Sequence, residues 1–236
     1  MMDLDLFDIA DFHAHILPGV DHGSENLSTS LSQLAIAERN SVKRVLATPH
    51  FYPNTHTLST FLELRDGAAD ELYKARKVSM PEFQVGAEVL ICDGLHRFPD
   101  IDKLCFSGTK YLMLELPFFD FSESYAVTAG ELVDMGYEVI LAHADRYPEN
   151  VIDTMLASGV EHLQINTDSL VGIFRKKNHI FRWIDEGLVC ALGSDIHGTC
   201  GKAYRDFVKA QKSLGELLYL IKNASDKIWN EIETIK

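Results

Sequence analysis

The sequence predicts an α/β protein built on a parallel β-sheet that closes into a barrel, and two observations support this fold class. Short apolar runs alternate regularly with amphipathic stretches, which is the pattern of strands connected by helices. Histidine and acidic residues follow most of these runs, at what would be the carboxyl ends of the strands. A barrel gathers residues from nearly all of its strands at one mouth, whereas a doubly wound sheet uses only a few strand ends. The pattern therefore favours a barrel.

Seven strands and seven helices are expected in turn. Short apolar runs predict strands over Phe7–Phe12, Lys43–Thr48, Glu82–Ala87, Tyr111–Leu116, Glu138–Ala142, His162–Asn166 and Leu188–Gly193. Amphipathic stretches predict helices over Ser28–Asn40, Leu58–Lys77, Ser122–Met135, Pro148–Ser158, Asn178–Glu186, Lys202–Ser213 and the C-terminal Glu216–Lys236. Ser28 and Ser122 are expected to be N-caps. Because no linker or low-complexity segment interrupts the alternation, we expect residues 1–236 to form a single domain.

Composition and missing motifs exclude several classes of function. A net charge of −13 argues against binding to nucleic acid or to an anionic membrane surface. The chain shows neither a signal peptide nor a membrane-spanning run, and its four cysteines form no C-x-x-C pair, so we expect a cytoplasmic protein with reduced thiols. It contains no C-x5-R, G-x-S-x-G, Walker A or H-E-x-x-H motif, which disfavours cysteine phosphatases, serine hydrolases, P-loop enzymes and zincins.

Six of the seven predicted strands deliver a histidine or an acid at the same end. These residues are His13, His15, His50, Glu88, Glu115, His143, Asp195 and His197. His13 and His15 are two apart in an extended chain, so both point to one face and can bind one ion. Charges at the ends of buried strands are costly unless they are compensated, and a metal cluster compensates all of them together. Imidazole and carboxylate without thiolate suit manganese, iron or zinc.

Other polar and aromatic residues near the strand ends are not assigned to the metal site. The sixth strand offers no clear ligand, although Asn166 and Asp168 lie there, and Asn166 is expected to satisfy backbone groups. Two aromatic stretches, Phe51–Tyr52 and Phe118–Phe121, fit either a lip for a ring-shaped substrate or loop packing. Four further histidines do not end strands and are expected to face solvent or to cap backbone groups: His56, His96, His162 and His179.

Six short motifs, taken in order, resemble a known superfamily. They are DFHAHILPGVDHG, ATPHFYP, VGAEV, LELPF, LAHADRY and GSDIHG. This set is similar to that of the PHP (polymerase and histidinol phosphatase) superfamily. The HILPGVDxG and HxxRY elements resemble the CpsB/CapC-type, manganese-dependent protein-tyrosine phosphatases of bacterial capsule and exopolysaccharide loci. The resemblance extends from Asp11 to about His197, and it implies a distorted (β/α)7 TIM-like barrel, the PHP fold, with a trinuclear metal centre at its mouth.

The resemblance also implies which residues hold which ion. The first ion would be held by His13, His15, Glu88 and Asp195. Glu88 would bridge to a second ion, which Glu115 and His143 also hold. The third ion would take His50, His197 and the residue that ends the VDxG motif. Two or three divalent ions are therefore expected, with manganese as the first choice and iron or zinc as alternatives.

This chain departs from the family pattern at two places. The third site usually has a carboxylate where this chain has His22, which can still ligate but removes a negative charge. The arginine that often follows the SDxH motif is absent, so Lys202 or Arg205 is expected to contact phosphate in its place.

The activity that the resemblance implies is hydrolysis of phosphotyrosine, with a bacterial tyrosine kinase of capsule or exopolysaccharide synthesis as the substrate protein. A hydroxide that bridges two ions would attack phosphorus in line. Arg146, three residues after His143, would bind two phosphate oxygens. Two alternatives remain open: a phosphatase of small molecules such as histidinol phosphate, and a non-catalytic partner of a kinase whose metal site has decayed.

Overall fold

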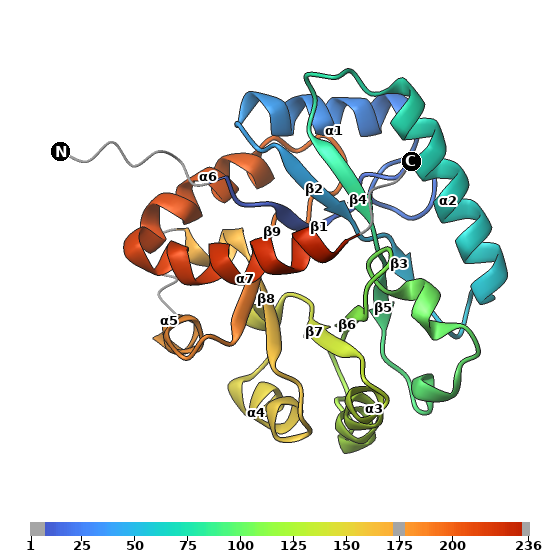
Figure 1. Ribbon diagram of the computed structural model, residues 1–236, viewed down its shortest axis with the longest axis vertical. Helices are drawn as coiled ribbons and strands as arrows, with labels where there is room; N and C mark the ends of the chain where they lie inside the picture. The colour runs from blue at the N-terminus through green and yellow to red at the C-terminus, as the bar shows by residue number, and fades with distance from the viewer. Residues whose placement is uncertain (1–7, 172–177, 233–236) are drawn as a thin grey trace.

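The computed structural model describes residues 8–171 and 178–232, and its strands form one parallel barrel (Figure 1). One sheet has the order β1-β2-β4 and a second has the order β3-β5-β6-β7-β8-β9. The strands are β1 (Asp11–Ala14), β2 (Arg44–Ala47), β3 (His50–Phe51), β4 (Glu82–Val85), β5 (Glu88–Leu90), β6 (Tyr111–Glu115), β7 (Glu138–Leu141), β8 (His162–Asn166) and β9 (Val189–Gly193). Every pair of neighbouring strands is parallel, which confirms the predicted α/β fold.

Hydrogen bonds between the first and last strands close the ring. The backbone N–H of Asp195 donates to His13 and that of His15 donates to Ile196, and a parallel bridge joins Ala14 to Ile196. Two of the seven predicted strands are each followed by a short second strand that was not predicted: β3 follows β2 after Thr48–Pro49, and β5 follows β4 after Gly86–Ala87. Pro49 has no N–H to donate to a ladder, so pairing is interrupted there. The result is the distorted barrel of seven strand positions that the sequence predicts.

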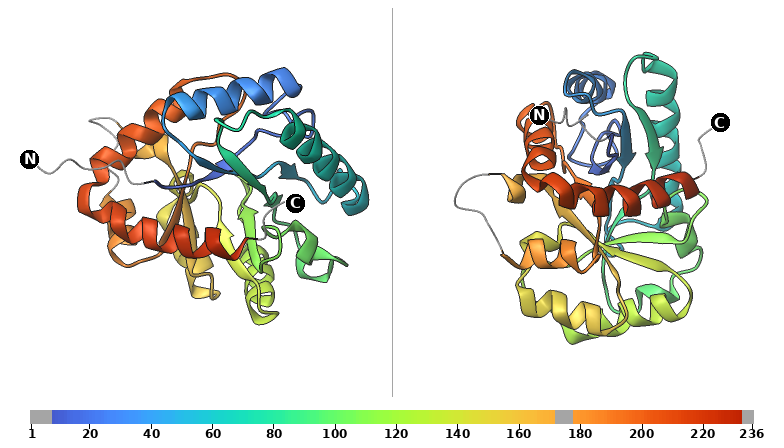
Figure 2. Two further views of the ribbon diagram at one scale, coloured as in Figure 1. Left: turned by 45° about the horizontal axis from the view of Figure 1, so that its top comes forward. Right: turned by 60° about the vertical axis from the view of Figure 1, so that its left-hand side comes forward.

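Helices surround the barrel wall and one crosses its amino end (Figures 1 and 2). The α-helices are α1 (Leu27–Arg39), α2 (Leu58–Ala75), α3 (Glu123–Asp134), α4 (Glu149–Ala157), α5 (Asn178–Asp185), α6 (Lys202–Leu214) and α7 (Leu218–Glu231). Short 3-10 helices are η1 (Leu95–Arg97), η2 (Ile101–Leu104), η3 (Ala144–Arg146), η4 (Thr167–Leu170) and η5 (Gly215–Leu217). None of the described helices is both long and apolar enough to cross a membrane.

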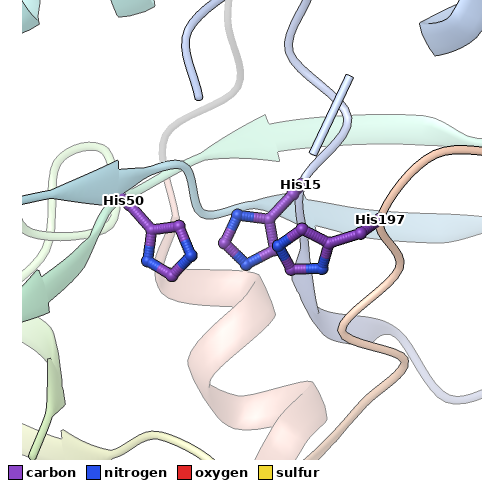
Figure 3. A group of neighbouring side chains, drawn as sticks. All are labelled: His15, His50 and His197. Atoms are coloured by element: carbon purple, nitrogen blue, oxygen red, sulfur yellow. The ribbon is translucent and has the colours of Figure 1, made fainter. Parts of the chain in front are cut away.

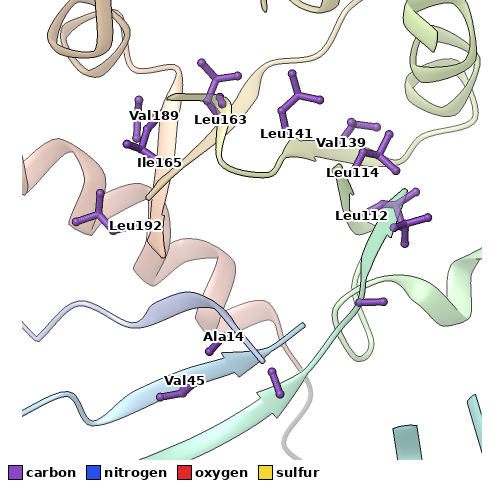
Figure 4. Packing of buried hydrophobic residues seen from close by; sticks show 14 of the residues in the cluster. Ala14, Val45, Leu112, Leu114, Val139, Leu141, Leu163, Ile165, Val189 and Leu192 are labelled. Atoms are coloured by element: carbon purple, nitrogen blue, oxygen red, sulfur yellow. The ribbon is translucent and has the colours of Figure 1, made fainter. Parts of the chain in front are cut away.

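The strand side chains alternate between two apolar layers. Leu112 and Leu114 of β6 belong to the larger cluster with the helices, whereas Met113 belongs to a smaller cluster within the barrel. Figure 4 shows residues of the larger cluster around the strands. Trp229 of α7 packs edge-on against Phe12, with ring centroids 6.0 Å apart, so α7 closes the amino end of the barrel with apolar side chains. The polar carboxyl end is left as the place for a site.

Several predicted boundaries differ from the structure. Strand β1 begins at Asp11 rather than Phe7, because pairing with β2 starts where Asp11 meets Val45; Phe7 itself lies outside the described residues. The N-cap of α1 is Asn26 rather than Ser28, since the Asn26 side chain accepts a hydrogen bond from the Thr29 N–H at 3.0 Å. Ser122 is the N-cap of α3, as predicted. The C-terminal helix begins only at Leu218, after the 3-10 turn η5.

Candidate metal centre

The carboxyl ends of the strands bring most of the predicted ligands together inside the barrel mouth. His13 and His15 come from β1 and the residue after it, His50 and Glu88 begin β3 and β5, and Glu115 ends β6. His143, Asp195 and His197 follow β7 and β9. His50 and Glu88 are also direct register partners in neighbouring strands. Figure 3 shows the rings of His15, His50 and His197, three of these ligands, gathered from separate parts of the chain.

Three side chains, those of His13, His15 and Glu88, have the mutual spacing of ligands around one ion, and Asp195 lies beside the two histidines. The Nε2 atoms of His13 and His15 lie 3.1 Å apart, and each is close to Glu88 Oε2, at 3.2 and 3.3 Å. Asp195 Oδ1 lies 3.7 and 3.4 Å from the same two nitrogens. Four ligands about 2.1 Å from a single ion at tetrahedral angles are separated by roughly 3.4 Å. His13, His15 and Glu88 therefore have the spacing that a bound ion requires, and Asp195 is near enough to the two histidines to complete the set.

Glu88 lies at the centre of the cluster. Its side chain is buried, and besides His13 and His15 it contacts His50 Nδ1 at 2.9 Å and His143 Nε2 at 2.7 Å. Burial alone would raise the pKa of Glu88, but the surrounding imidazoles hold it well below its ordinary value. A carboxylate that stays ionised with its two oxygens facing different groups of imidazoles is suited to bridge two ions.

A second group of ligands lies beside the first and shares Glu88. Glu115 has one oxygen 3.7 Å from His50 Nδ1 and the other 3.6 Å from His143 Nε2. Atoms of His50, Glu88 and Glu115 all lie within 4.8 Å of one another. Burial, and then the Glu88 carboxylate, raise the pKa of Glu115 to about 8. Two carboxylates this close repel each other, so the site attracts positive charge between them.

A third group consists of imidazoles. Atoms of His15, His50 and His197 lie within 4.8 Å of one another. The ring of His22 stacks near His197 and His50, at centroid distances of 4.5 and 4.9 Å, although its side chain is exposed to solvent. Burial, and then the His15 charge, lower the pKa of His197 to about 4, which keeps this ring neutral and able to ligate.

Asp21 supports this site, and the sequence reasoning did not assign it a role. Its Oδ2 atom accepts from His15 Nδ1 at 2.7 Å and from the His50 backbone N–H at 3.0 Å. Its other oxygen accepts from the Gly23 N–H at 2.8 Å. A Cβ atom on Gly23 would lie 2.0 Å from the His15 Cβ, so only glycine lets this loop fold over His15. The sequence did contain a signal for Asp21, because this residue directly precedes the proposed ligand His22 in the VDHG motif.

Two ligand-bearing turns have strained backbone. His143 and Asp195 adopt positive φ angles of 33° and 49°. Non-glycine residues rarely adopt this conformation, and where they do the surrounding structure must hold them. Both side chains are turned into the barrel mouth at the points where β7 and β9 end.

Arg146 and two aromatic residues border the cluster. The Arg146 guanidinium lies 2.5 Å from Asp195 Oδ2 and 6.0 Å from the centroid of the Phe118 ring. Burial alone would lower the pKa of Arg146, but the Asp195 carboxylate raises it, so the group stays cationic. Phe118, at 54% exposure, stacks 5.8 Å from His143, and Tyr52 stacks 5.1 Å from His50. Phe51, in contrast, is fully buried and packs against Phe61 of α2, so packing is the alternative that holds for this residue.

The remaining predicted residues make contacts elsewhere. Lys202 begins α6 and places its ammonium 2.6 Å from Asp206 of the same helix, and the guanidinium of Arg205 turns back toward Gly201. The four histidines expected to lie outside the site contact other partners: His56 lies near Tyr52, His96 near Arg97, His162 near Glu138, and His179 near Trp183.

Fold and site together define the class: a parallel β/α barrel with a histidine–carboxylate centre at its mouth, suited to hold several divalent ions. The chain belongs to the CpsB/CapC family, because the family model described as "Capsular polysaccharide synthesis, CpsB/CapC" matches residues 9–213. This confirms the family that the sequence motifs indicated.

Two relatives and two solved structures are similar to this chain. The tyrosine-protein phosphatase YwqE of Bacillus subtilis is 30% identical over 200 residues, which cover 79% of this chain and 76% of YwqE. The putative tyrosine-protein phosphatase CapC of Staphylococcus aureus is 26% identical over 208 residues, with coverage of 83% and 80%.

The structural similarities concern the fold. A crystal structure from work on YwqE and on CpsB of Streptococcus pneumoniae, described there as unique metal-dependent tyrosine phosphatases, superimposes with a TM-score of 0.77, 23% identity and coverage of 96% of both chains. The histidinol phosphate phosphatase of Lactococcus lactis, solved with zinc, L-histidinol and phosphate, gives a TM-score of 0.54 at 17% identity, with coverage of 92% and 94%.

Proposed function

We propose that this protein is a metal-dependent protein-tyrosine phosphatase. The observation that carries the proposal is the close mutual spacing of His13, His15 and Glu88, with Asp195 beside the two histidines. Two further groups of ligands adjoin this one, as expected for a centre that holds two or three ions. The activity printed for YwqE, a relative at 30% identity, supports the choice of reaction.

The residues of the cluster fit divalent ions of the manganese, iron or zinc type. Its donors are imidazole nitrogens and carboxylate oxygens, with no thiolate among them. Among the described residues, buried His197 Nε2 has no hydrogen-bond partner, so it keeps a lone pair for a ligand bond. The carboxylates of Glu88 and Asp195 raise the pKa of His13 to about 9 although burial alone would lower it, which shows the pull of the site on positive charge.

Metal ions bound here would activate a water molecule as the nucleophile and neutralise phosphoryl oxygens. Besides the metal ions, the positively charged side chain of Arg146 can bind phosphate. Its guanidinium stays charged beside Asp195, and its planar group of N–H donors suits two oxygens of a phosphate group. Phe118 packs on the same guanidinium and leaves about half of its ring surface open to a substrate ring. A phenol with a pKa of about 10 leaves more easily than an alkoxide, so this site needs no strong general acid for phosphotyrosine.

The proposed substrate protein is a bacterial tyrosine kinase that controls capsule or exopolysaccharide synthesis, in keeping with the description of the family. At a net charge of −13 the protein recognises phosphate locally, through its ions and Arg146, and not by bulk attraction. A phosphatase of small molecules and a kinase partner without activity are the competing functions. Histidinol phosphate and a phosphotyrosyl peptide, tested side by side with metal analysis of the purified protein, separate these three functions.

We expect hydrolysis of a phosphotyrosyl peptide to require a divalent ion and to survive thiol alkylation. Chelation should reduce turnover to background, and added Mn²⁺ should restore it. Iodoacetamide should leave turnover intact, because the proposed chemistry uses no thiolate. Burial raises the pKa of Cys105 and Cys190 to about 12, so the reagent should react mainly with the exposed Cys200, which has no role in the proposed reaction. Steady-state rates on the peptide, with and without each reagent, make the measurement. Loss of activity with iodoacetamide together with resistance to EDTA would overturn the proposal.

Replacing His22 by Asp should preserve the fold and leave an active enzyme with a changed metal preference. His22 is exposed, so the replacement disturbs no packing, and a carboxylate beside His50 and His197 favours the harder Mn²⁺ relative to Zn²⁺. Metal titrations of activity, with metal content measured on the same samples, report the change. His56→Asp makes the same change of charge at another exposed histidine and serves as the control. If H22D leaves both metal content and metal dependence unchanged, His22 is a loop residue and not a ligand.

A further inference from the structure

Strand β8 is the one strand position of the barrel that contributes none of the proposed ligands, yet its side chains reach three of them. Gln164 Oε1 lies 2.9 Å from His13 Nδ1 and 2.7 Å from the backbone N of His143. Gln164 Nε2 donates to Asn166 Oδ1 at 2.9 Å, and Asn166 Nδ2 donates to Asp195 Oδ2 at 3.0 Å. Both amides are buried.

The two ends of this chain of hydrogen bonds fix the direction of every bond within it. The backbone N–H of His143 can only donate, so it requires the oxygen of Gln164 at that end. The ionised carboxylate of Asp195 can only accept, so it requires the nitrogen of Asn166 at the other end. The Gln164 nitrogen then faces the Asn166 oxygen. Neither amide can be flipped without placing two donors or two acceptors against each other.

This fixed direction determines what the two ligands present to a metal ion. Because Gln164 Oε1 only accepts, His13 Nδ1 must carry a proton, which leaves the lone pair on Nε2, the atom that faces His15 and Glu88. Asp195 Oδ2 is occupied by Asn166 and Arg146, so its Oδ1 is the oxygen directed at His13 and His15. Gln164 and Asn166 thus orient the two ligands through the atoms that face away from the proposed ion.

Strand β9 passes so close to the two amides that no larger residue than glycine fits at Gly193. Gly193 of β9 is the register partner of Asn166. A Cβ atom at this position would lie 2.5 Å from Gln164 Nε2 and 2.5 Å from His13 Cβ. The close approach of β9 explains why this buried strand ends in a glycine, and it holds the Gln164 side chain against His13.

We propose that Gln164 and Asn166 form an amide relay that positions His13 and Asp195 for the first metal ion. A neutral amide fixes both ligands without adding charge to a site that already holds three carboxylates, Glu88, Glu115 and Asp195. The relay residues are positioning residues, since they act through ligands and not on substrate. The inference rests on the proposed metal centre. Replacing a group that orients a metal ligand from behind commonly lowers metal affinity by about 10- to 100-fold.

Gln164→Met keeps the length of the side chain and removes both halves of its amide. We expect the dissociation constant for Mn²⁺, measured by calorimetry, to rise by about 10- to 100-fold. Gln84→Met is the matched control, because Gln84 is a buried glutamine on β4 whose Oε1 has no hydrogen-bond partner among the described residues. The control should bind Mn²⁺ as the wild type does.

Asn166→Ala tests the second half of the relay and replaces Q164M if that variant does not fold. It removes the donor to Asp195 but leaves the bond between Gln164 and His13, so the loss of affinity should be smaller than in Q164M. In the zinc-loaded protein, the Nδ1 proton of His13 should give an exchange-protected NMR signal in the wild type and in N166A. Q164M should lose that protection, which a general loosening of the fold would not do selectively.

The outcomes separate the relay from the proposed function. If the wild type binds no divalent ion, the metal centre itself is refuted. If the wild type binds Mn²⁺ and Q164M binds it equally well with the His13 proton still protected, the relay alone is wrong. Unchanged affinity in N166A would restrict any positioning role to Gln164 and would also overturn the relay as proposed.

Discussion

Replacing Glu88 by Gln should reduce kcat/KM on a phosphotyrosyl peptide by about 10³-fold or more. Glu88 is buried and contacts four imidazoles, so it belongs to more than one of the ligand groups. The amide keeps the shape but removes the negative charge, and an ion bound here supplies several kcal/mol of charge stabilisation to the transition state. A loss of about 4 kcal/mol corresponds to a factor of about 10³ in rate.

Metal content should fall together with activity in this variant. Mass spectrometry of metals in the purified protein, with kinetics on the same samples, makes the measurement. Glu138→Gln is the control, because Glu138 is an exposed acid at the opposite end of β7 that pairs only with His162 among the ion pairs of the described residues. Full metal content with wild-type kinetics in E88Q would contradict a bridging role for Glu88.

Replacing Arg146 by Ala should reduce kcat/KM by about 10²-fold or more, the effect of losing one preorganised donor to developing charge. Metal content should stay near that of the wild type, because Asn166 still holds Asp195 Oδ2 after the guanidinium is removed. The melting temperature should also change little, since the Arg146 side chain is 37% exposed and partly exposed ion pairs contribute little to stability. Arg146→Lys should recover only part of the loss, because an ammonium cannot bind two oxygens as a fork.

Kinetics with metal analysis distinguish the roles of Arg146. Arg182→Ala is the control, since Arg182 is exposed and pairs with Glu149 on the outside of the barrel. Wild-type kinetics in R146A would remove Arg146 from the site. Loss of metal in R146A would instead make it a support of Asp195.

The sequence by itself determined the barrel and most of the candidate ligands. Alternation of apolar runs with amphipathic stretches is a local signal, and it predicted all seven strand positions to within a few residues. The ligands followed from the same signal, because a residue that ends a parallel strand in a barrel must lie at the common mouth. Asp195 and Glu88, more than 100 positions apart, could be placed together for this reason.

Tertiary structure alone decided how those ligands are held. In the sequence, Gln164 and Asn166 are ordinary polar residues of a strand. Their proposed positioning role depends on the residues of the neighbouring strands β7 and β9 that lie next to them. For Phe51 the sequence left both a substrate lip and packing open, and only its contact with Phe61 of α2 decides for packing. A periodic pattern gives the direction of a side chain relative to its own strand. Its partner lies on another strand or helix, and only the packing of the whole barrel determines which atom meets which.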